Sequence, residues 1–470
     1  MNRDVFHLLI GILILLSGCT LTPKYTKTEA PISSGWPTGA AYEETSARPG
    51  TPKAKDLQWR EFFTDERLRQ VIETALHNNR DLRLAALNVE RARALYGIQR
   101  AELFPSVNVA GNGMRQRVPA DLSATGKKMI AEQYSVNLGM SSWEIDFFGR
   151  IQSLKDRALE EYLATEQAHR STHILLVSSV ANAYLALAAD RENLKLAQST
   201  LETQETAYNL RRRRYEIGLA SELDLSRAQT QVDTARGDIA RFTQLVAQDE
   251  NTLNLLVGSP SPIPNEILPA DLARVKPPKD ISPGLSSEVL LRRPDIMARE
   301  HRLKAANANI GAARAAFFPR ISLTTAVGTA SRELSDLFKS GQGTWSFVPQ
   351  IIMPIFDARL WSAYKVTKVE KEIALAQYEK AIQTAFREVA DALAIRGTVN
   401  KQVSAQQSLV EAVARTYSLS NARYARGIDG YLSVLDAQRS LYAAEQGLIA
   451  IRLFRLTNLV KLYAVLGGGE

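Results

Sequence analysis

Residues 305–319 read AANANIGAARAAFFP, and a weaker copy of this stretch and its surroundings occurs 214 positions earlier in the chain. Seven residue pairs match at this offset: Asp81/Asp295, Ala92/Ala306, Ala94/Ala308, Gly97/Gly311, Ala101/Ala315, Phe104/Phe318 and Pro105/Pro319. Six more match at an offset of 209: Arg214/Arg423, Tyr215/Tyr424, Gly218/Gly427, Leu223/Leu432, Ala228/Ala437 and Gln229/Gln438. A constant offset within each block indicates a tandem repeat. Each repeat is predicted to contain a helix, a strand region and two long helices joined by a turn.

The distribution of proline predicts where the long helices lie. No proline occurs in 120–259 or 355–470, whereas seven of the 18 prolines fall in 259–284. Proline-free runs of this length, rich in Ala, Leu, Glu, Arg and Gln, predict long helices on either side of an extended linker. A helix over about 149–215 would be on the order of 100 Å long.

Apolar residues at alternating spacings of three and four predict that these helices pair as coiled coils. One seam has a single polar member, Asp249, and consists of Leu225, Ala228, Val232, Ala235, Ile239, Phe242, Val246, Asp249, Leu253 and Leu256. A second seam contains many small residues and consists of Leu154, Ala158, Tyr162, Thr165, His169, Thr172, Leu176, Ser179, Ala183 and Leu187.

Four segments between the helices alternate apolar with small or polar residues, as strands with one apolar face do. They begin at Val107, Tyr134, Ile321 and Trp345. This pattern fits either a membrane barrel with a wet lumen or a soluble sheet with one buried face. Four strands cannot close a barrel, and lipid tolerates no open sheet edge. A membrane barrel would therefore require several copies of the chain.

The first 18 residues have the form of a secretory signal peptide, with an apolar run from Val5 to Leu16 that is short for a membrane span. Leu16-Ser17-Gly18-Cys19 resembles a bacterial lipobox, in which the cysteine is acylated after cleavage before it. Cys19 is the only cysteine in the chain. The alternative is an ordinary signal peptide followed by an inert buried cysteine. Thr20 is not the aspartate that commonly retains such lipoproteins in the inner membrane, which favours the outer membrane.

Composition and motifs argue against most other chemistry. With 45% hydrophobic residues the chain is not disordered, and one cysteine excludes a disulfide framework. The net charge of +8 is spread along the chain, so no nucleic-acid partner is expected. His169 and His173 have the spacing of a metal pair but lack the His-Glu-x-x-His pattern. Gly126-Lys127-Lys128 does not complete a phosphate-binding loop. We expect no enzyme activity, cofactor or metal.

Four motifs carry a resemblance to a known family: WEIDFFGR at 143–150, LSSEVLLRRPDI at 285–296, the stretch at 305–319 quoted above, and LGGG at 466–469. With these motifs the chain resembles the TolC-like outer-membrane factor family over nearly its whole mature length. Within that family it resembles the lipoprotein branch that serves tripartite pumps of the RND type.

The resemblance implies an α+β membrane protein that forms a homotrimer. Its 12-stranded β-barrel, with four strands per chain, would continue into a long α-helical coiled-coil tunnel in the periplasm. It would be a passive exit duct, lipid-anchored in the outer membrane and in contact with outer-membrane lipid. Its partners would be a periplasmic adaptor protein and an inner-membrane RND-type transporter. Residues 119–132 and 332–344 would be the external loops.

The predicted organisation has five parts. They are a signal peptide over 1–18, an acylated extended segment over 19–66, a first repeat over 67–258, a proline-rich linker over 259–284, and a second repeat over 285–470.

The turns of the two helical hairpins are expected at 214–221 and 423–430. The family resemblance implies that these turns dock the adaptor, through Arg214, Tyr215, Gly218, Leu219, Ser221, Arg423, Tyr424 and Gly427. A glycine after the last helical turn also commonly ends a helix, so the alternative to adaptor docking is that these residues only cap the helices.

Leu432 and Asp436 lie one helical turn apart and so share a face. The resemblance implies that they ring the closed periplasmic aperture, where three aspartates would repel one another and favour cations. Arg426 and Arg439 are candidates for ion pairs between copies that hold the closed state. The alternative is an ordinary solvated helix face.

Three other functions remain open from the sequence. They are the outer duct of a type I protein-secretion system, a structural coiled-coil lipoprotein, and a periplasmic adaptor. The LGGG ending and the lipobox favour efflux over secretion, and the duplicated strand pairs argue against an adaptor. The substrate range cannot be predicted, because selectivity in such pumps belongs mainly to the transporter.

Overall fold

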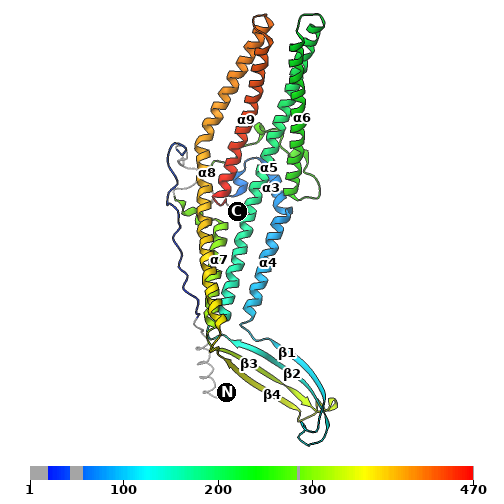
Figure 1. The fold of residues 1–470 in the computed structure, drawn as a ribbon, viewed down its shortest axis with the longest axis vertical. Helices are drawn as coiled ribbons and strands as arrows, with labels where there is room; N and C mark the ends of the chain where they lie inside the picture. Colours follow the sequence, from blue (N-terminus) through cyan, green and yellow to red (C-terminus); the bar gives the residue numbers. More distant parts are fainter. Residues whose placement is uncertain (1–19, 43–56, 283–285, 469–470) are drawn as a thin grey trace. The chain divides into compact units, whose positions relative to one another are not determined.

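The computed structural model describes residues 20–42, 57–282 and 286–468; the expected signal peptide and Cys19 lie outside these ranges. Two short helices, α2 (Trp59–Phe62) and α3 (Glu66–Asn78), come first. The first repeat then forms α4 (Arg80–Ala101), β1 (Val107–Val118), β2 (Met129–Ile145), α5 (Arg150–Glu216) and α6 (Glu222–Val257). The second repeat forms α7 (Pro294–Ala315), β3 (Arg320–Ser331), β4 (Gly343–Ile352), α8 (Ala358–Ala425) and α9 (Tyr431–Val465) (Figure 1). The predicted order of elements is confirmed in both repeats.

Burial along α6 confirms its predicted seam. None of the ten seam residues is exposed, and Ala228, Val232 and Phe242 are fully buried. Asp249, the polar member, lies beside Asp190 of α5, and burial and that neighbouring carboxylate raise its pKa to about 6.

Helix α5 is buried on more sides than a single seam would produce. Residues 180–189 are buried or half-buried without interruption, whereas the seam residues Leu154 and Tyr162 are only half-buried. The proline-rich linker covers a further side of the helix, because the Arg191 guanidinium donates a 2.8 Å hydrogen bond to the Pro269 carbonyl. Within the described residues α5 is the one helix long and apolar enough to cross a membrane, but most of that segment is buried among its neighbours. It is therefore explained as a core helix.

The four strands form one antiparallel sheet in the order β1-β2-β3-β4. Pairing of β2 with β3 joins the two repeats, with Leu138 opposite Val327. The sheet is longer at β2 than expected: the loop between β1 and β2 covers 119–128, so residues 129–132 are strand and not loop. The second loop covers 332–342, because Gly343 and Thr344 already belong to β4.

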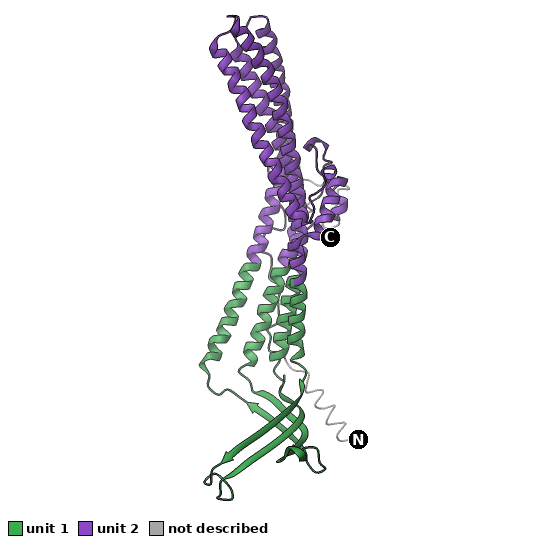
Figure 2. Cartoon of the chain, turned by 90° about the vertical axis from the view of Figure 1, so that its right-hand side faces the viewer, with its two compact units in different colours: residues 1–29, 88–166, 298–378 green, residues 30–87, 167–297, 379–470 purple. Residues whose placement is uncertain are grey.

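The described residues group into two compact units, and each unit takes segments from both repeats (Figure 2). Unit 1 lies within 1–29, 88–166 and 298–378 and contains the sheet. Unit 2 lies within 30–87, 167–297 and 379–470 and contains the helical hairpin ends. Its core includes Phe62, whose ring stacks on Tyr463 with centroids 4.1 Å apart. The repeats are thus units of sequence rather than of packing.

An extended N-terminal segment lies along α7 in unit 1. Asn307 Nδ2 donates to the Pro23 carbonyl at 2.7 Å, and Arg314 Nη1 donates to the Leu21 carbonyl at 3.2 Å. Gly311 permits this close approach, because a Cβ there would lie 2.2 Å from Thr22 Oγ1. Its repeat partner Gly97 has open space around it, so only the second copy of this glycine is required by packing.

Candidate functional site

The register of the sheet separates its side chains into one apolar and one polar face. Opposed residues in an antiparallel sheet point to the same side, so each row of the register can be assigned to a face. The apolar face carries Val107, Val109, Val136, Leu138, Met140, Leu323, Val327, Trp345, Phe347 and Ile351. The other face is mostly small or polar. It carries Asn108, Ala110, Asn112, Ser135, Asn137, Gly139, Ser322, Thr324, Ala326, Gly328 and Ser346, together with the apolar residues Met114, Val118, Met129, Val348 and Ile352 near the ends of the strands. This alternation is that of a membrane barrel wall, with lipid on one side and water on the other.

A β-bulge keeps this separation intact where β2 leaves the regular register. Ser141 and Ser142 of β2 together lie opposite the single residue Thr324 of β3, and Ser142 adopts a left-handed φ of 51°. The extra residue returns Trp143 to the apolar face opposite Leu323. Without the bulge, the last part of β2 would present its side chains to the wrong face.

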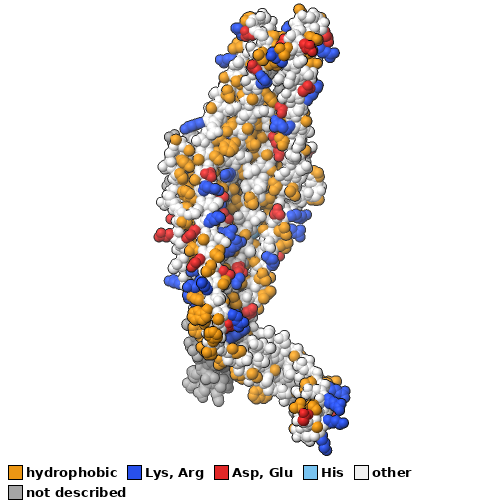
Figure 3. Space-filling view, viewed as in Figure 1, with side chains coloured by type: hydrophobic (Ala, Val, Ile, Leu, Met, Phe, Trp, Pro, Cys, Tyr) orange, Lys and Arg blue, Asp and Glu red, His pale blue; other side chains and the backbone are white. Residues whose placement is uncertain are grey.

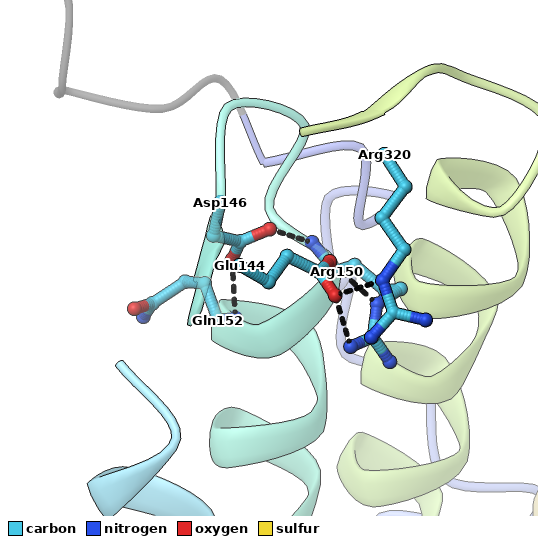
Figure 4. Close-up of polar contacts among 5 residues, drawn as sticks. All are labelled: Glu144, Asp146, Arg150, Gln152 and Arg320. Atoms are coloured by element: carbon cyan, nitrogen blue, oxygen red, sulfur yellow. Dashed lines mark hydrogen bonds and ion pairs between the residues drawn. The ribbon is translucent and has the colours of Figure 1, made fainter. Parts of the chain in front are cut away.

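Both repeats contribute to an ion-pair cluster around the buried Glu144, where β2 enters α5 (Figure 4). The Glu144 side chain, 8% exposed, accepts two 2.8 Å hydrogen bonds from Arg150 and one 2.5 Å contact from Arg320. Asp146 accepts from the backbone N–H groups of Arg150 and Gln152, at 2.7 and 2.8 Å, and so caps the start of α5. The cluster fixes the strand-to-helix junction. The sequence marked 143–150 only as a signature, and Arg320 was missed because its partner is 176 residues away.

The two predicted hairpin turns have the same backbone structure. In the first, Leu219 N–H donates to the Arg214 carbonyl at 2.7 Å and Gly218 N–H to the Tyr215 carbonyl at 2.9 Å. In the second, Ile428 and Gly427 donate to Arg423 and Tyr424 at 3.0 and 2.9 Å. Each is a Schellman motif, and its glycine has a φ of 75° or 73°.

The side chains differ between the turns. Ser221 caps α6 by accepting from the Asp224 N–H at 3.1 Å. The second turn has no side-chain cap at Gly430 and instead holds an ion pair, with Arg423 Nε 2.6 Å from an Asp429 oxygen. Exposed apolar side chains lie in or next to both turns: Ile217, Leu219, Leu223, Ile428 and Leu432.

A polar and aromatic contact joins the two hairpins just behind their turns. Arg214 donates to the Tyr424 hydroxyl at 3.3 Å. The guanidinium of Arg211, a residue only 5% exposed, lies 3.4 Å from the centroid of the Tyr431 ring. Tyr431 belongs to a buried cluster with Ala228, Val434 and Leu435. Arg211 could not be singled out from the sequence, because four consecutive arginines at 211–214 give no sign of which one is buried.

The two residues expected at the aperture lie on an exposed face of α9. Leu432 is 47% exposed and Asp436 is also exposed, whereas Val434 and Leu435 between them are buried. Asp436 pairs with Arg439 of the same helix. Arg439 thus has a partner within its own chain, and the ion pairs expected between copies for Arg426 and Arg439 stay a prediction.

The two histidines with the spacing of a metal pair lie on α5. His169 and His173 are both half-buried. Among the residues that the structure describes, no three His, Cys, Asp or Glu side chains are arranged to hold a metal ion.

The architecture defines a class of protein: outer-membrane channel subunits with four strands per chain and long helices. The structure superposes with a TM-score of 0.85 on the open state of the MtrE outer membrane channel of Neisseria gonorrhoeae, at 37% identity over 96% of this chain and 98% of that one. Two relatives from Pseudomonas putida, the toluene efflux pump outer membrane protein TtgC and the antibiotic efflux pump outer membrane protein ArpC, are each 50% identical over 100% of this chain and 96% of their own length.

A sequence profile described as "Outer membrane efflux protein" matches residues 71–259 and 285–468. The chain belongs to this family of outer-membrane efflux pump components. The two matched segments fall on the two repeats, and the predicted fold class and efflux function agree with the family and its relatives.

Proposed function

We propose that three copies of this chain form a 12-stranded barrel that serves as the exit duct of a tripartite efflux pump. The observation that carries this proposal is the sheet: it has one apolar face, and in the described residues β1 and β4 each pair on one side only. Lipid cannot solvate such edges, so they must pair with other copies. Four strands are also too few to close alone.

The cargo would be small toxic compounds, delivered by an inner-membrane transporter through a periplasmic adaptor. The names of the two Pseudomonas relatives, a toluene and an antibiotic efflux pump protein, support this class of cargo. A passive role fits a chain in which the sequence offers no nucleotide-binding loop.

The adaptor would dock on the hairpin turns. Their apolar residues, including Leu219 and Ile428, are exposed in the single chain. Such side chains could pack against the apolar face of a helical partner. The residues assigned to docking are Arg214, Tyr215, Gly218, Leu219, Ser221, Arg423, Tyr424 and Gly427. Arg214 and Tyr424 would act chiefly by holding the two turns together, because they bond to each other.

Leu432 and Asp436 would form the closed aperture, with one copy of each residue from each chain. Their joint exposure on one face of α9 supports this assignment, because a face that is neither buried nor salt-bridged to another helix is available to the axis of an assembly. Three carboxylates close to one axis repel one another and attract cations.

Cys19 would carry the lipid anchor. The segment that follows it supports this assignment, because the Leu21 carbonyl accepts a hydrogen bond from Arg314. Arg314 is only six residues before Arg320, where β3 begins. The chain therefore emerges beside the membrane-facing strands. Replacing Cys19 with Ser is expected to abolish incorporation of labelled palmitate, and undiminished labelling would contradict the anchor.

Cysteine crosslinking tests the shared barrel. Cysteines placed on the polar face of the outer strands, at Asn108, Ala110 or Asn112 of β1 combined with Thr344 or Ser346 of β4, should join copies on oxidation. The expected product is a covalent trimer in at least one combination. The matched control, Ser135→Cys with Ala330→Cys, bridges two opposed residues within one chain and should give only monomer.

Two results would overturn the proposal. One is the absence of any crosslinked trimer across the whole set of pairs. The other is a deletion strain whose sensitivity to antibiotics and toluene is unchanged while secretion of a protein is lost, which would favour the type I secretion duct.

A further inference from the structure

The apolar face of the sheet carries arginines at the end nearest the loops. On β1 this face runs through Val107 and Val109 and continues two residues at a time to Arg115 and Arg117. The register confirms the side, because Arg117 is opposite Ile130 and Arg115 is opposite Glu132. These arginines therefore point to the same side as the apolar band, and not into the polar face.

Strand geometry places the arginines at the edge of the hydrocarbon layer. At about 3.3 Å per residue, Arg117 lies about 33 Å along the strand from Val107. A strand tilted near 45° crosses a bilayer core in about 9–11 residues. Tyr134 lies over Gly113 just before the arginines, where a Cβ on Gly113 would be 3.3 Å from the Tyr134 ring. An aromatic ring at this level is typical of the interfacial girdle of a membrane barrel.

Two lysines extend the cationic surface into the adjoining loop. Lys127 and Lys128 directly precede β2, and both are exposed. Arg115 pairs with Glu132 at 2.8 Å, whereas Arg117, Lys127 and Lys128 form no ion pair with the described residues. Figure 3 shows Lys and Arg side chains gathered at this end of the sheet. Leu122, 77% exposed in the same loop, adds an apolar contact beside the cations.

We propose that Arg117, Lys127 and Lys128, with Arg115, bind the phosphate groups of lipids in the membrane leaflet nearest these loops. Arginine and lysine at a membrane surface attract anionic headgroups, and arginine can bind phosphate through two parallel hydrogen bonds. The occupant is a lipid and not a soluble anion, because Arg115 and Arg117 stand on the lipid-facing side directly above the apolar band. This surface rests on the proposed barrel, but it is independent of cargo and of the aperture.

Native mass spectrometry of the purified full-length protein in detergent tests this surface. The probes are lipid A bearing its two phosphates, the same lipid after enzymatic removal of the phosphates, and inorganic phosphate alone. The wild type is expected to retain phosphorylated lipid A. Its affinity for the dephosphorylated form should be lower by about tenfold or more.

The test variant is Arg117→Gln/Lys127→Gln/Lys128→Gln, which leaves the Arg115–Glu132 pair intact. Its affinity for phosphorylated lipid A should fall by about tenfold or more. The matched control, Lys365→Gln/Lys380→Gln/Arg387→Gln, removes three exposed cations of α8 and should bind as the wild type does. If the triple variant fails to assemble, Lys127→Glu/Lys128→Glu changes only the loop and should lower the affinity as well.

Three results would overturn the proposal. They are equal binding of the phosphorylated and dephosphorylated lipid by the wild type, equal lipid binding by the test and control variants, and binding of inorganic phosphate as tightly as lipid A. The same spectra separate this outcome from failure of the barrel: a wild type that is not trimeric contradicts the proposed assembly, whereas a trimer without phosphate preference contradicts the lipid surface alone.

Discussion

The two helical hairpins, α5–α6 and α8–α9, have the same turn but different charges at equivalent positions. Both turns are Schellman motifs closed by a glycine with positive φ. At the repeat offset of 209, Arg227 of the first hairpin corresponds to Asp436 of the second, and Asp249 corresponds to Asn458. The two copies therefore share their backbone geometry at the turn, whereas each has its own pattern of charge. Properties that depend on the turn should be equal in both hairpins, and properties that depend on charge should not.

The largest expected effect on stability comes from Arg211, which only the first hairpin supplies. Its repeat partner is Ser420, so no equivalent contact runs in the other direction. Replacing Arg211 with Met removes a buried cation over the Tyr431 ring and should cost about 2 kcal/mol. A lower thermal midpoint by circular dichroism would report this loss.

Arg212→Met is the matched control. Arg212 is exposed and pairs with Glu216 at 3.1 Å within the same helix, so its loss should cost less than about 0.5 kcal/mol. Equal losses in the two variants would contradict the idea that Arg211 joins the hairpins.

The next effect should be the same in both hairpins. Gly218→Ala and Gly427→Ala each place a Cβ in a left-handed conformation, at a cost of about 1–2 kcal/mol. An added Cβ would meet no atom within 4 Å at either site, so the cost is conformational alone.

Gly237 provides the opposite case, because it lies inside α6 with open space around it. Gly237→Ala should raise stability by about 0.5–1 kcal/mol. The thermal midpoints of the three glycine variants should be measured together. A clear difference between Gly218→Ala and Gly427→Ala would show that the two turns do not have the same backbone geometry.

The smallest stability effect concerns Asp249, whose pKa is raised to about 6 by burial and by Asp190. The folded state favours the protonated form of Asp249. The contribution of this group to the free energy of unfolding is therefore fully present below the ordinary pKa of aspartate, and it is lost as the pH rises through about 6. Asp249→Asn introduces the residue of the second hairpin. It should raise the thermal midpoint near neutral pH and change it little near pH 4. Solvent screening keeps the effect small, since both carboxylates are partly exposed.

Asp233→Asn, at an exposed site on the same helix, is the control and should not alter the pH dependence. If Asp249→Asn leaves the midpoint at neutral pH unchanged or lowers it, the carboxylate pair does not destabilise the first hairpin.

Much of this fold could be predicted from periodicity. Spacings of three and four placed the seam of α6, and alternation placed all four strands, because these signals are local to each element. The predicted loop at 119–132 was too long: Met129–Glu132 lie in β2 because they pair with β1 beyond the alternating core. The predicted seam of α5 included too few of its buried residues. The linker that covers another side of this helix lies about 80 residues away in the sequence, so periodicity within the helix does not reveal it.

The contacts that position the functional parts could not be predicted in the same way. Arg320 meets Glu144, and Arg211 meets Tyr431, only after the two repeats have folded together. Sequence patterns record which face of a helix or strand is apolar, but not which distant charge a buried carboxylate or aromatic ring will meet. The turns were predicted correctly because a Schellman motif depends on six consecutive residues and one glycine.

We propose that the second hairpin closes the channel through a charge that the first hairpin lacks, and planar-bilayer conductance can measure this closure. Purified wild-type trimer should show a small, cation-preferring conductance. Asp436→Asn should raise the conductance several-fold and weaken the preference for cations, whereas Arg227→Gln at the equivalent position should leave both near wild type. A trimer that conducts no ions even with Asp436→Asn, or two variants with the same conductance and ion preference, would contradict closure by Asp436.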